Sequence, residues 1–229
     1  MVAVIGDVHG CYFTLAELYQ NIKIKYPEIE VYCVGDLVDR GNYSREVIDF
    51  IVDNKIKFTP GNHDYMFFHY FRKPDTIFAK SWYYNGNEAT LNSYEEFPDK
   101  MNDHIDLIKS APLFFNTADC FISHAGISNR YQNFLNGNLD DYLPQLIKLI
   151  EKDYENDIGV MWTRDELMNL GKAQIVGHTK STELIISKNS DAYYIDTGAC
   201  SGNKLSCVIM NKSKLIEIIE EPTHLNDIL

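Results

Sequence analysis

Four short motifs, each directly after an apolar run, constrain this fold more than any other feature of the sequence. They are Gly6-Asp7-Val8-His9-Gly10, Gly35-Asp36-Leu37-Val38-Asp39-Arg40-Gly41, Gly61-Asn62-His63-Asp64 and His124-Ala125-Gly126. The apolar runs are short and rich in β-branched or aromatic residues, as buried strands are, and they occupy residues 2–5, 31–34, 55–59 and 120–123. Glycine permits a tight turn directly after each apolar run, so each motif is predicted to present polar side chains at a strand end.

Helical periodicity separates the first three apolar runs. Apolar residues recur at intervals of three and four between residues 15 and 22, and again between residues 47 and 52. Ser44 stands before the second of these segments, where a helix N-cap is expected. Strands that alternate with helices predict an α/β layer fold.

The rest of the chain completes this prediction. Residues 65–110 are rich in aromatic and polar residues without a β rhythm, which predicts a small helical cap over one edge of the site, the expected specificity element. Short strands of a second sheet, packed on the first, are predicted at residues 174–176, 184–186, 192–195, 205–210 and 215–219. We expect a single domain over residues 1–229: two mixed β-sheets packed as a sandwich and flanked by helices, with a frayed tail after Glu221.

The polar residues of the motifs form a ligand set for two divalent cations. Asp7 and His9 are two residues apart, so an extended chain points both side chains the same way. Asp36 can share its carboxylate between two cations, and Asn62 offers an amide oxygen. Such oxygen and imidazole ligands suit hard or borderline divalent cations. The imidazole ligands predicted for the second cation are His124 and His178.

A site of this kind predicts hydrolysis of a phosphoester. Two cations about 3.5–4 Å apart acidify a bridging water and neutralise the phosphoryl group under attack. The metal-bridging hydroxide would attack in line, and His63 is placed to protonate the leaving oxygen, with Asp39 as its orienting partner. Arg40 and Arg164 are candidates to clamp phosphate oxygens through the guanidinium fork.

Composition limits the classes of binding partner and the cellular compartment that we expect for this protein. The formal net charge is −12 and no basic stripe is present, which argues against nucleic acid as a partner. The opening apolar run is too short for a signal peptide and no run approaches a membrane span, so we expect a soluble, cytoplasmic protein with no membrane partner. The five cysteines form no CxxC pair, as suits a reducing cytosol, and Cys11 beside the first motif is the one to watch for oxidation.

The order and wording of these motifs resemble the calcineurin-like metallophosphoesterases, and within them the phosphoprotein phosphatase branch, over nearly the whole chain. The likeness is greatest to the lambda-type serine/threonine protein phosphatases of bacteria and bacteriophages, through Trp162-Thr163-Arg164, Gly177-His178-Thr179 and residues 194–199. The resemblance implies two manganese ions at the six ligands, with iron or zinc as alternatives. It also implies phosphate contacts from Arg40 and Arg164, an acid pair of His63 with Asp39, and phosphoserine or phosphothreonine in proteins as the substrate.

Two alternative functions remain open. Asp64 stands where the protein phosphatases of this branch usually carry glutamate, and bacterial diadenosine tetraphosphatases share the same motifs. A dinucleoside polyphosphate is therefore the alternative substrate, and a hydrolase of that kind would stack adenine on aromatic residues of the cap. The second alternative is a non-catalytic metal-binding interaction module, against which the pair of His63 and Asp39 argues.

Several residues also have a structural interpretation. Trp82 and Trp162 are candidate walls of the cleft, but Trp82, with Tyr83 and Tyr84, more simply forms the core of the cap. Arg164 could instead pack on a tryptophan ring as a cation–π pair. Asp196 is expected to close a turn beneath His178. Three further histidines are expected to be solvent-facing or structural: His69, His104 and His224.

Overall fold

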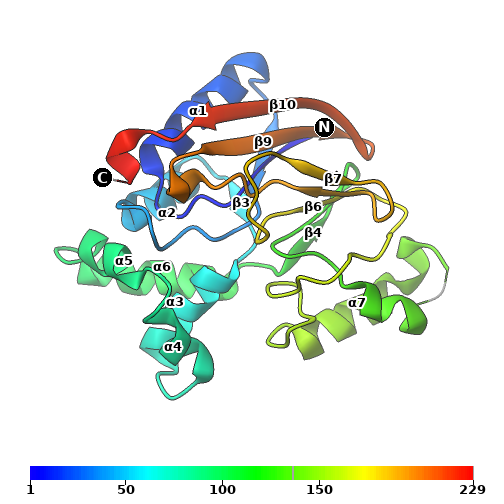
Figure 1. Cartoon of the computed structure of the whole chain (residues 1–229), viewed down its shortest axis with the longest axis horizontal. Helices are drawn as coiled ribbons and strands as arrows, with labels where there is room; N and C mark the ends of the chain where they lie inside the picture. Colours follow the sequence, from blue (N-terminus) through cyan, green and yellow to red (C-terminus); the bar gives the residue numbers. More distant parts are fainter. Residues whose placement is uncertain (136, 229) are drawn as a thin grey trace.

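Two packed β-sheets with helices outside them make up the computed structural model, which describes residues 1–135 and 137–228 (Figure 1). The first sheet contains β1 (Val2–Ile5), β2 (Glu30–Cys33), β3 (Lys57–Phe58), β9 (Lys204–Asn211) and β10 (Lys214–Pro222). Its order is β10-β9-β1-β2-β3, in which β1, β2 and β3 are parallel and β9 is antiparallel to both of its neighbours.

The second sheet is also mixed and has five strands. It contains β4 (Phe114–Asn116), β5 (Phe121–Ser123), β6 (Gln174–Val176), β7 (Ile185–Ser187) and β8 (Ala192–Tyr194). Its order is β4-β5-β6-β8-β7, with β5, β6 and β8 parallel at its centre. The expected α/β sandwich of two mixed sheets flanked by helices is thereby confirmed.

The residues of β1 show how one strand serves two cores. Val2 and Val4 belong to the apolar core between the sheets, whereas Ala3 and Ile5 belong to the core under the helices. Successive side chains of a strand point to opposite faces, so a strand buried on both faces must be apolar at every position. This is why the first run contains no polar residue before Gly6.

Helices cover the first sheet and extend beyond its edge (Figure 1). Those between its strands are α1 (Tyr12–Lys25) and α2 (Ser44–Asp53). Residues 65–110 are largely helical, as expected. They include most of α3 (Asn62–Arg72) and all of α4 (Ile77–Trp82), α5 (Asn87–Ser93) and α6 (Pro98–Ser110). The remaining helical elements are η1 (Asn129–Phe134), α7 (Leu139–Asp153), η2 (Ala199–Ser201) and η3 (Leu225–Asp227). Within the two described ranges, no helix has the length and apolarity needed to cross a membrane.

The last two strands lie in a different sheet from the one predicted. We expected residues 205–210 and 215–219 in the second sheet, but β9 pairs with β1, and β10 pairs with β9. β9 is buried along most of its length, with Cys207 and Ile209 toward the helices and Val208 and Met210 toward the second sheet. A strand that is apolar on both faces suits a position inside the first sheet, next to β1.

Two local predictions are wrong. The N-cap of α2 is Tyr43, while Ser44 is already helical, and its hydroxyl accepts a hydrogen bond from the Asp39 backbone N–H at 3.2 Å. The described residues after Glu221, 222–228, are also not a frayed tail, because η3 packs against the start of α1; residue 229 lies outside the described ranges. The fully buried Asp227 accepts hydrogen bonds from the backbone N–H of Phe13 and Thr14 and from the Thr14 hydroxyl, at 3.0, 2.9 and 2.6 Å.

Replacing Asp227 by alanine is expected to lower the free energy of unfolding by about 1–3 kcal/mol, because buried N–H donors of α1 would lose their acceptor. Denaturant unfolding measures this change. Asn226→Ala is the matched control, since Asn226 is exposed on the same turn. Equal stability of the two variants would show that the carboxylate does not hold the carboxyl-terminal segment on α1.

Candidate metal centre

The candidate metal ligands follow the carboxyl ends of five strands, three that are parallel in the first sheet and two that are parallel in the second. β1, β2 and β3 run side by side and are followed by the first three motifs, while β5 and β6 are followed by His124 and by Gly177-His178. Carboxyl ends of parallel strands meet at one edge, so residues far apart in sequence come together there. Three of the predicted ligands adopt positive φ to turn their side chains inward: His9 (45°), Asp36 (49°) and His178 (64°).

Asp36 lies at the middle of the predicted ligand set. Its carboxylate belongs to a buried cluster with His9 and His63 and to a second buried cluster with Asp7 and His124. His9 Nε2 lies 3.3 Å from Asp36 Oδ2, and His124 Nε2 lies 3.6 Å from Asp36 Oδ1. One carboxylate between two groups of ligands is the arrangement expected for a bridging ligand.

The second group meets at the amide oxygen of Asn62. Asn62 Oδ1 lies 3.1 Å from His124 Nε2 and 2.8 Å from His178 Nδ1. The structure therefore brings all six predicted ligands into one buried site, where each is at most 9% exposed. Glycines make the close approach possible, because a Cβ on Gly177 would collide with Asp7 Oδ1 and one on Gly61 with Asp36 Oδ1.

The tautomers of the histidines point to bound cations. His9 Nδ1 lies 2.8 Å from the Val38 carbonyl and His124 Nδ1 lies 2.9 Å from the Val34 carbonyl, so both Nδ1 atoms donate. A neutral imidazole carries one proton, so each Nε2 has a lone pair. That of His124 faces Asn62 Oδ1 and Asp36 Oδ1, whereas that of His9 accepts a hydrogen bond from Arg40 Nη1 at 2.8 Å, with Asp36 Oδ2 at 3.3 Å. His178 is the mirror case, since its Nε2 donates to the Trp162 carbonyl at 3.1 Å and its Nδ1 faces Asn62. Lone pairs facing lone pairs are stabilised by a shared cation.

Charges and unsatisfied atoms in the site agree with this conclusion. Asp7 Oδ1 is buried and has no hydrogen-bond partner among the described residues, while Asp7 Oδ2 accepts from the His178 backbone N–H at 3.0 Å. Burial, followed by the carboxylates of Asp196 and Asp36, raises the pKa of Asp7 well above its usual range. Burial lowers the pKa of all three imidazole ligands, that of His178 to about 3. Neutral imidazoles around unpaired carboxylate oxygens fit two divalent cations.

His63 and Asp39 form the predicted pair beside these ligands. His63 Nδ1 donates to Asp39 Oδ2 at 2.6 Å, and both side chains are buried. Burial alone would lower the pKa of His63, but the Asp36 and Asp39 carboxylates outweigh it and raise this pKa. An imidazole held in one tautomer and made easier to protonate has the properties of a general acid.

Asp39 is oriented by two residues of the helical segment. The sequence analysis did not connect either of them with the pair of His63 and Asp39. Trp82 Nε1 donates to Asp39 Oδ2 at 2.8 Å, and the Thr90 hydroxyl donates to Asp39 Oδ1 at 2.8 Å. The prediction of Trp82 as a wall of the cleft is wrong, because its ring is fully buried. No local sequence signal links Trp82 to a residue 43 positions earlier.

Trp82→Phe is expected to reduce kcat about tenfold for substrates with poor leaving groups, because Asp39 loses an N–H donor and holds His63 less firmly. Steady-state kinetics measures this effect. Trp162→Phe is the matched control, since the Trp162 indole N–H has no hydrogen-bond partner within residues 1–135 and 137–228 and its loss removes no such bond. An equal fall of kcat in both variants would count against orientation of Asp39 by Trp82.

The two predicted arginines occupy different positions at the site. Arg40 lies over the imidazoles, with Nη1 donating to His9 Nε2 at 2.8 Å and Nη2 donating to His63 Nε2 at 2.9 Å. Arg164 is exposed and makes one long hydrogen bond, from Nη1 to the His178 carbonyl at 3.4 Å. The cation–π contacts of the described residues involve Arg45, Lys57 and Lys73, so the stacking alternative for Arg164 is wrong.

Asp64 and Asp196 support the loops of the site. The fully buried Asp64 accepts hydrogen bonds from the backbone N–H of Leu37, Val38 and Gly61, which ties the second motif to the third. Burial and the nearby Asp36 raise the pKa of Asp64 to about 7. Asp196 accepts from the Gly198 backbone N–H at 3.1 Å, which confirms the predicted turn.

Some neighbouring residues differ from expectation. Tyr83 and Tyr84 are exposed, so they do not form the core of the cap as predicted. All five cysteines are free. Cys11 is fully buried and its thiol donates to the His9 carbonyl at 3.6 Å, whereas the half-buried Cys200 thiol lies 3.9 Å from Arg40 Nη1. The histidines expected to be solvent-facing or structural have hydrogen-bond partners: Thr76 for His69, Tyr94 for His104 and the Asn226 backbone N–H for His224.

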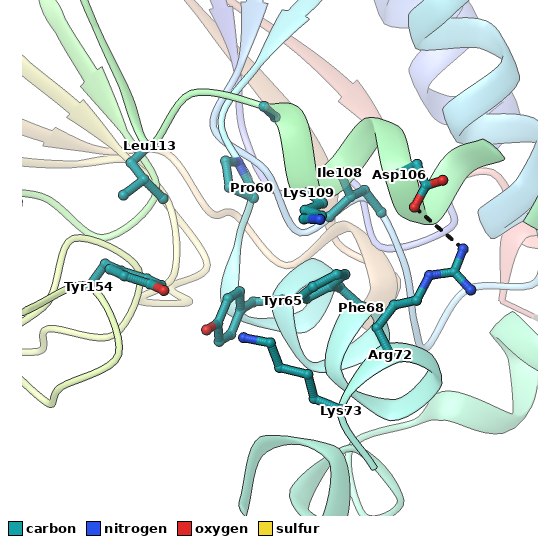
Figure 2. Close-up of a pocket in the computed structure, with 11 residues that line it drawn as sticks. Pro60, Tyr65, Phe68, Arg72, Lys73, Asp106, Ile108, Lys109, Leu113 and Tyr154 are labelled. Atoms are coloured by element: carbon teal, nitrogen blue, oxygen red, sulfur yellow. Dashed lines mark hydrogen bonds and ion pairs between the residues drawn. The ribbon is translucent and has the colours of Figure 1, made fainter. Parts of the chain in front are cut away.

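A cavity of about 490 Å³ lies between α3 and α6 (Figure 2). Figure 2 shows Tyr65 and Phe68 of α3 facing this space, with Lys73 beneath them and Tyr154 on the opposite side. The predicted site residues are not among those that line it in the described part of the chain.

Comparisons with known proteins agree with this site. The asymmetrical bis(5'-nucleosyl)-tetraphosphatase PrpE of Anoxybacillus flavithermus is 29% identical over 226 residues, covering 90% of this chain and 88% of that protein. The enzyme of the same name from Bacillus subtilis is 27% identical over 227 residues, covering 89% and 88%.

Solved structures share the fold at low sequence identity. A protein proposed to be a diadenosine tetraphosphatase has a TM-score of 0.63 at 17% identity, covering 98% of this chain and 94% of that one. A serine/threonine phosphatase of Saccharomyces cerevisiae has a TM-score of 0.58 at 15% identity, covering 97% and 80%. The model of the calcineurin-like phosphoesterase family matches residues 1–194. The chain therefore belongs to the calcineurin-like phosphoesterase family and is a metal-dependent phosphoesterase.

Proposed function

We propose that the protein hydrolyses dinucleoside tetraphosphates asymmetrically, to a nucleoside triphosphate and a nucleoside monophosphate. The observation that carries this proposal is the similarity to asymmetrical bis(5'-nucleosyl)-tetraphosphatases along about nine tenths of both chains. It favours the dinucleotide, which was the alternative from the sequence, over phosphoserine or phosphothreonine in proteins. The aspartate at position 64, where protein phosphatases of the branch usually have glutamate, agrees with this choice.

In this proposal the metal ligands are Asp7, His9, Asp36, Asn62, His124 and His178. When bound there, two divalent ions would supply Lewis acidity that activates water and neutralises the phosphoryl oxygens. Water adds its oxygen to phosphorus, and the bridging P–O bond on the far side breaks. The metal is proposed to be manganese, with iron or zinc as alternatives, because oxygen and imidazole ligands suit each of them.

The residues around the ligands are proposed to bind the phosphate and deliver a proton. Arg40 hydrogen-bonds both His9 Nε2 and His63 Nε2. The guanidinium must therefore move from these nitrogens to the phosphate before His9 can bind a metal ion and His63 can protonate the leaving oxygen. Arg164, at the rim near His178, is proposed to hold a second phosphate oxygen. Asp39 keeps the His63 ring oriented through Nδ1.

Serine/threonine protein phosphatase activity is the second candidate, because the motif order and the Trp-Thr-Arg sequence resemble that branch. A competition experiment separates the two candidates. Chelator-treated protein, reloaded with manganese, iron or zinc, is given diadenosine tetraphosphate and a phosphothreonine peptide together. We expect metal-dependent release of ATP and AMP, with the peptide consumed more slowly. Preference for the peptide would overturn the proposal, and binding of metal without turnover of either substrate would favour the interaction module.

A further inference from the structure

Two adjacent tyrosines lie in solvent after α4. Tyr83 is 67% exposed and Tyr84 is 85% exposed, and their ring centroids are 5.7 Å apart with the rings nearly perpendicular. An aromatic ring left in water forgoes the stabilisation that burial would give it. A contiguous patch of exposed aromatic surface is therefore a candidate surface for ligand binding.

The backbone ties the segment of these tyrosines to the loop that carries Asp39 and Arg40. Trp82, the preceding residue, hydrogen-bonds the Asp39 carboxylate through Nε1 at 2.8 Å. Gly86, two residues after Tyr84, accepts the Arg40 backbone N–H at 3.1 Å. Consecutive Cα atoms are about 3.8 Å apart, so the segment between these anchors cannot move far from the loop that carries Asp39 and Arg40.

Hydrogen bonds within the segment fix its shape. The backbone N–H groups of Tyr84 and Asn85 donate to the carbonyls of Ser81 and Trp82, at 3.1 and 3.0 Å. The Asn85 side chain adds a hydrogen bond to the Ser81 carbonyl at 2.7 Å. Tyr83 and Tyr84 are thus held on an ordered turn, which lowers the entropy lost when they bind a ligand.

The surface around the pair has the composition of a nucleotide subsite. A shallow hollow of about 650 Å³ is lined by Tyr70, Pro74, Ala79, Lys80, Tyr83 and Tyr84. Its one charged residue is a lysine, in a chain whose net charge is −12. Aromatic faces accept any base by stacking, and a cation beside them attracts phosphate.

We propose that Tyr83 and Tyr84 form a stacking platform for one base of the dinucleotide whose phosphate chain lies on the metal centre, with Lys80 lining the same hollow as the two tyrosines. This inference rests on the proposed dinucleoside tetraphosphate hydrolase and names residues that give it substrate specificity. A phosphopeptide has no base to stack, so the platform would favour the dinucleotide over the peptide. Removing one base–aromatic stack weakens binding by about tenfold or more.

Inhibition by a nucleotide and by its bare phosphate chain tests the platform. Hydrolysis of p-nitrophenyl phosphate by the manganese-loaded protein is inhibited with ATP and, separately, with inorganic tripolyphosphate. We expect the wild type to bind ATP at least about tenfold more tightly than tripolyphosphate. The double variant Y83A/Y84A should lose this preference, whereas Y83F/Y84F should keep it, because phenylalanine still stacks.

Controls separate this proposal from the proposed function. Phe134→Ala removes another exposed aromatic ring, on η1, and should leave the preference for ATP unchanged. Equal inhibition of the wild type by ATP and tripolyphosphate would overturn the platform, even if diadenosine tetraphosphate is hydrolysed. A platform that passes this test in a protein that prefers the phosphothreonine peptide would overturn the proposed function instead. Loss of the preference in Y83F/Y84F would also contradict stacking.

Discussion

Replacement of Asp36 by asparagine is expected to remove bound metal and activity together. The Asp36 carboxylate is the member common to both buried clusters of candidate ligands. Burial raises the pKa of Asp36, but His124, His63 and His9 in their protonated forms, together with the hydrogen bond from the His63 backbone N–H, lower this pKa below its usual range, so the group is charged. An amide of the same size keeps an oxygen for the His63 backbone N–H, which Asp36 Oδ1 accepts at 2.9 Å, but it brings no charge between two cations.

Metal analysis and steady-state kinetics measure the effect of Asp36→Asn. We expect less metal per chain after reconstitution and a fall of kcat/KM by about a hundredfold or more. Asp119→Asn is the matched control. Asp119 is also a buried, hydrogen-bonded aspartate, but its partner is the ammonium group of Met1 rather than a candidate ligand. Full metal content in Asp36→Asn would contradict the bridging role.

The motifs themselves made the strand ends of the site predictable. A strand buried on both faces is apolar at each position, and the first polar residues after it must lie at its end. This reasoning located Asp7, Asp36 and His124 correctly at the ends of β1, β2 and β5, where the structure brings them together. Glycine beside these residues then marked the turns, because added side chains would collide with the ligands.

Long-range pairing was not predictable in the same way. β9 reads as a short apolar strand whichever sheet it joins, and only its hydrogen bonds to β1, some 200 residues earlier, decide the sheet. Burial of the carboxyl-terminal segment rests on Asp227, whose partners Phe13 and Thr14 are more than 210 positions away. A charged residue near the end of a chain gives no local signal of such a contact.

The helical segment shows the same limit at the site. Trp82, Tyr83 and Tyr84 are adjacent aromatic residues, and their side-chain types alone do not predict which of them is buried. The structure buries Trp82 against Asp39 and leaves both tyrosines in solvent, because the chain turns between the anchors on Asp39 and Arg40. Composition identified an aromatic segment, but only the fold of the turn separates Trp82, which supports Asp39, from the two exposed tyrosines.

His63→Asn is expected to keep the metal and to lose about a hundredfold or more in kcat for substrates with poor leaving groups. The six candidate ligands do not include His63, and its ring is engaged by Asp39 through Nδ1 and by Arg40 through Nε2. Asparagine cannot donate a titratable proton, so the leaving oxygen must depart as an anion. Departure as an anion is slow for an alkoxide and much easier for a nitrophenolate or a nucleoside phosphate.

The dependence on the leaving group therefore tests the acid role more sharply than the size of the loss. Rates of the wild type and of His63→Asn are compared for an alkyl phosphate, p-nitrophenyl phosphate and diadenosine tetraphosphate, with metal content measured in parallel. His104→Asn is the matched control, because His104 is a buried histidine that hydrogen-bonds the Tyr94 hydroxyl outside the site. A loss that is equal for all three substrates would assign His63 to binding rather than to proton transfer, since only proton donation makes the variant sensitive to the basicity of the leaving oxygen.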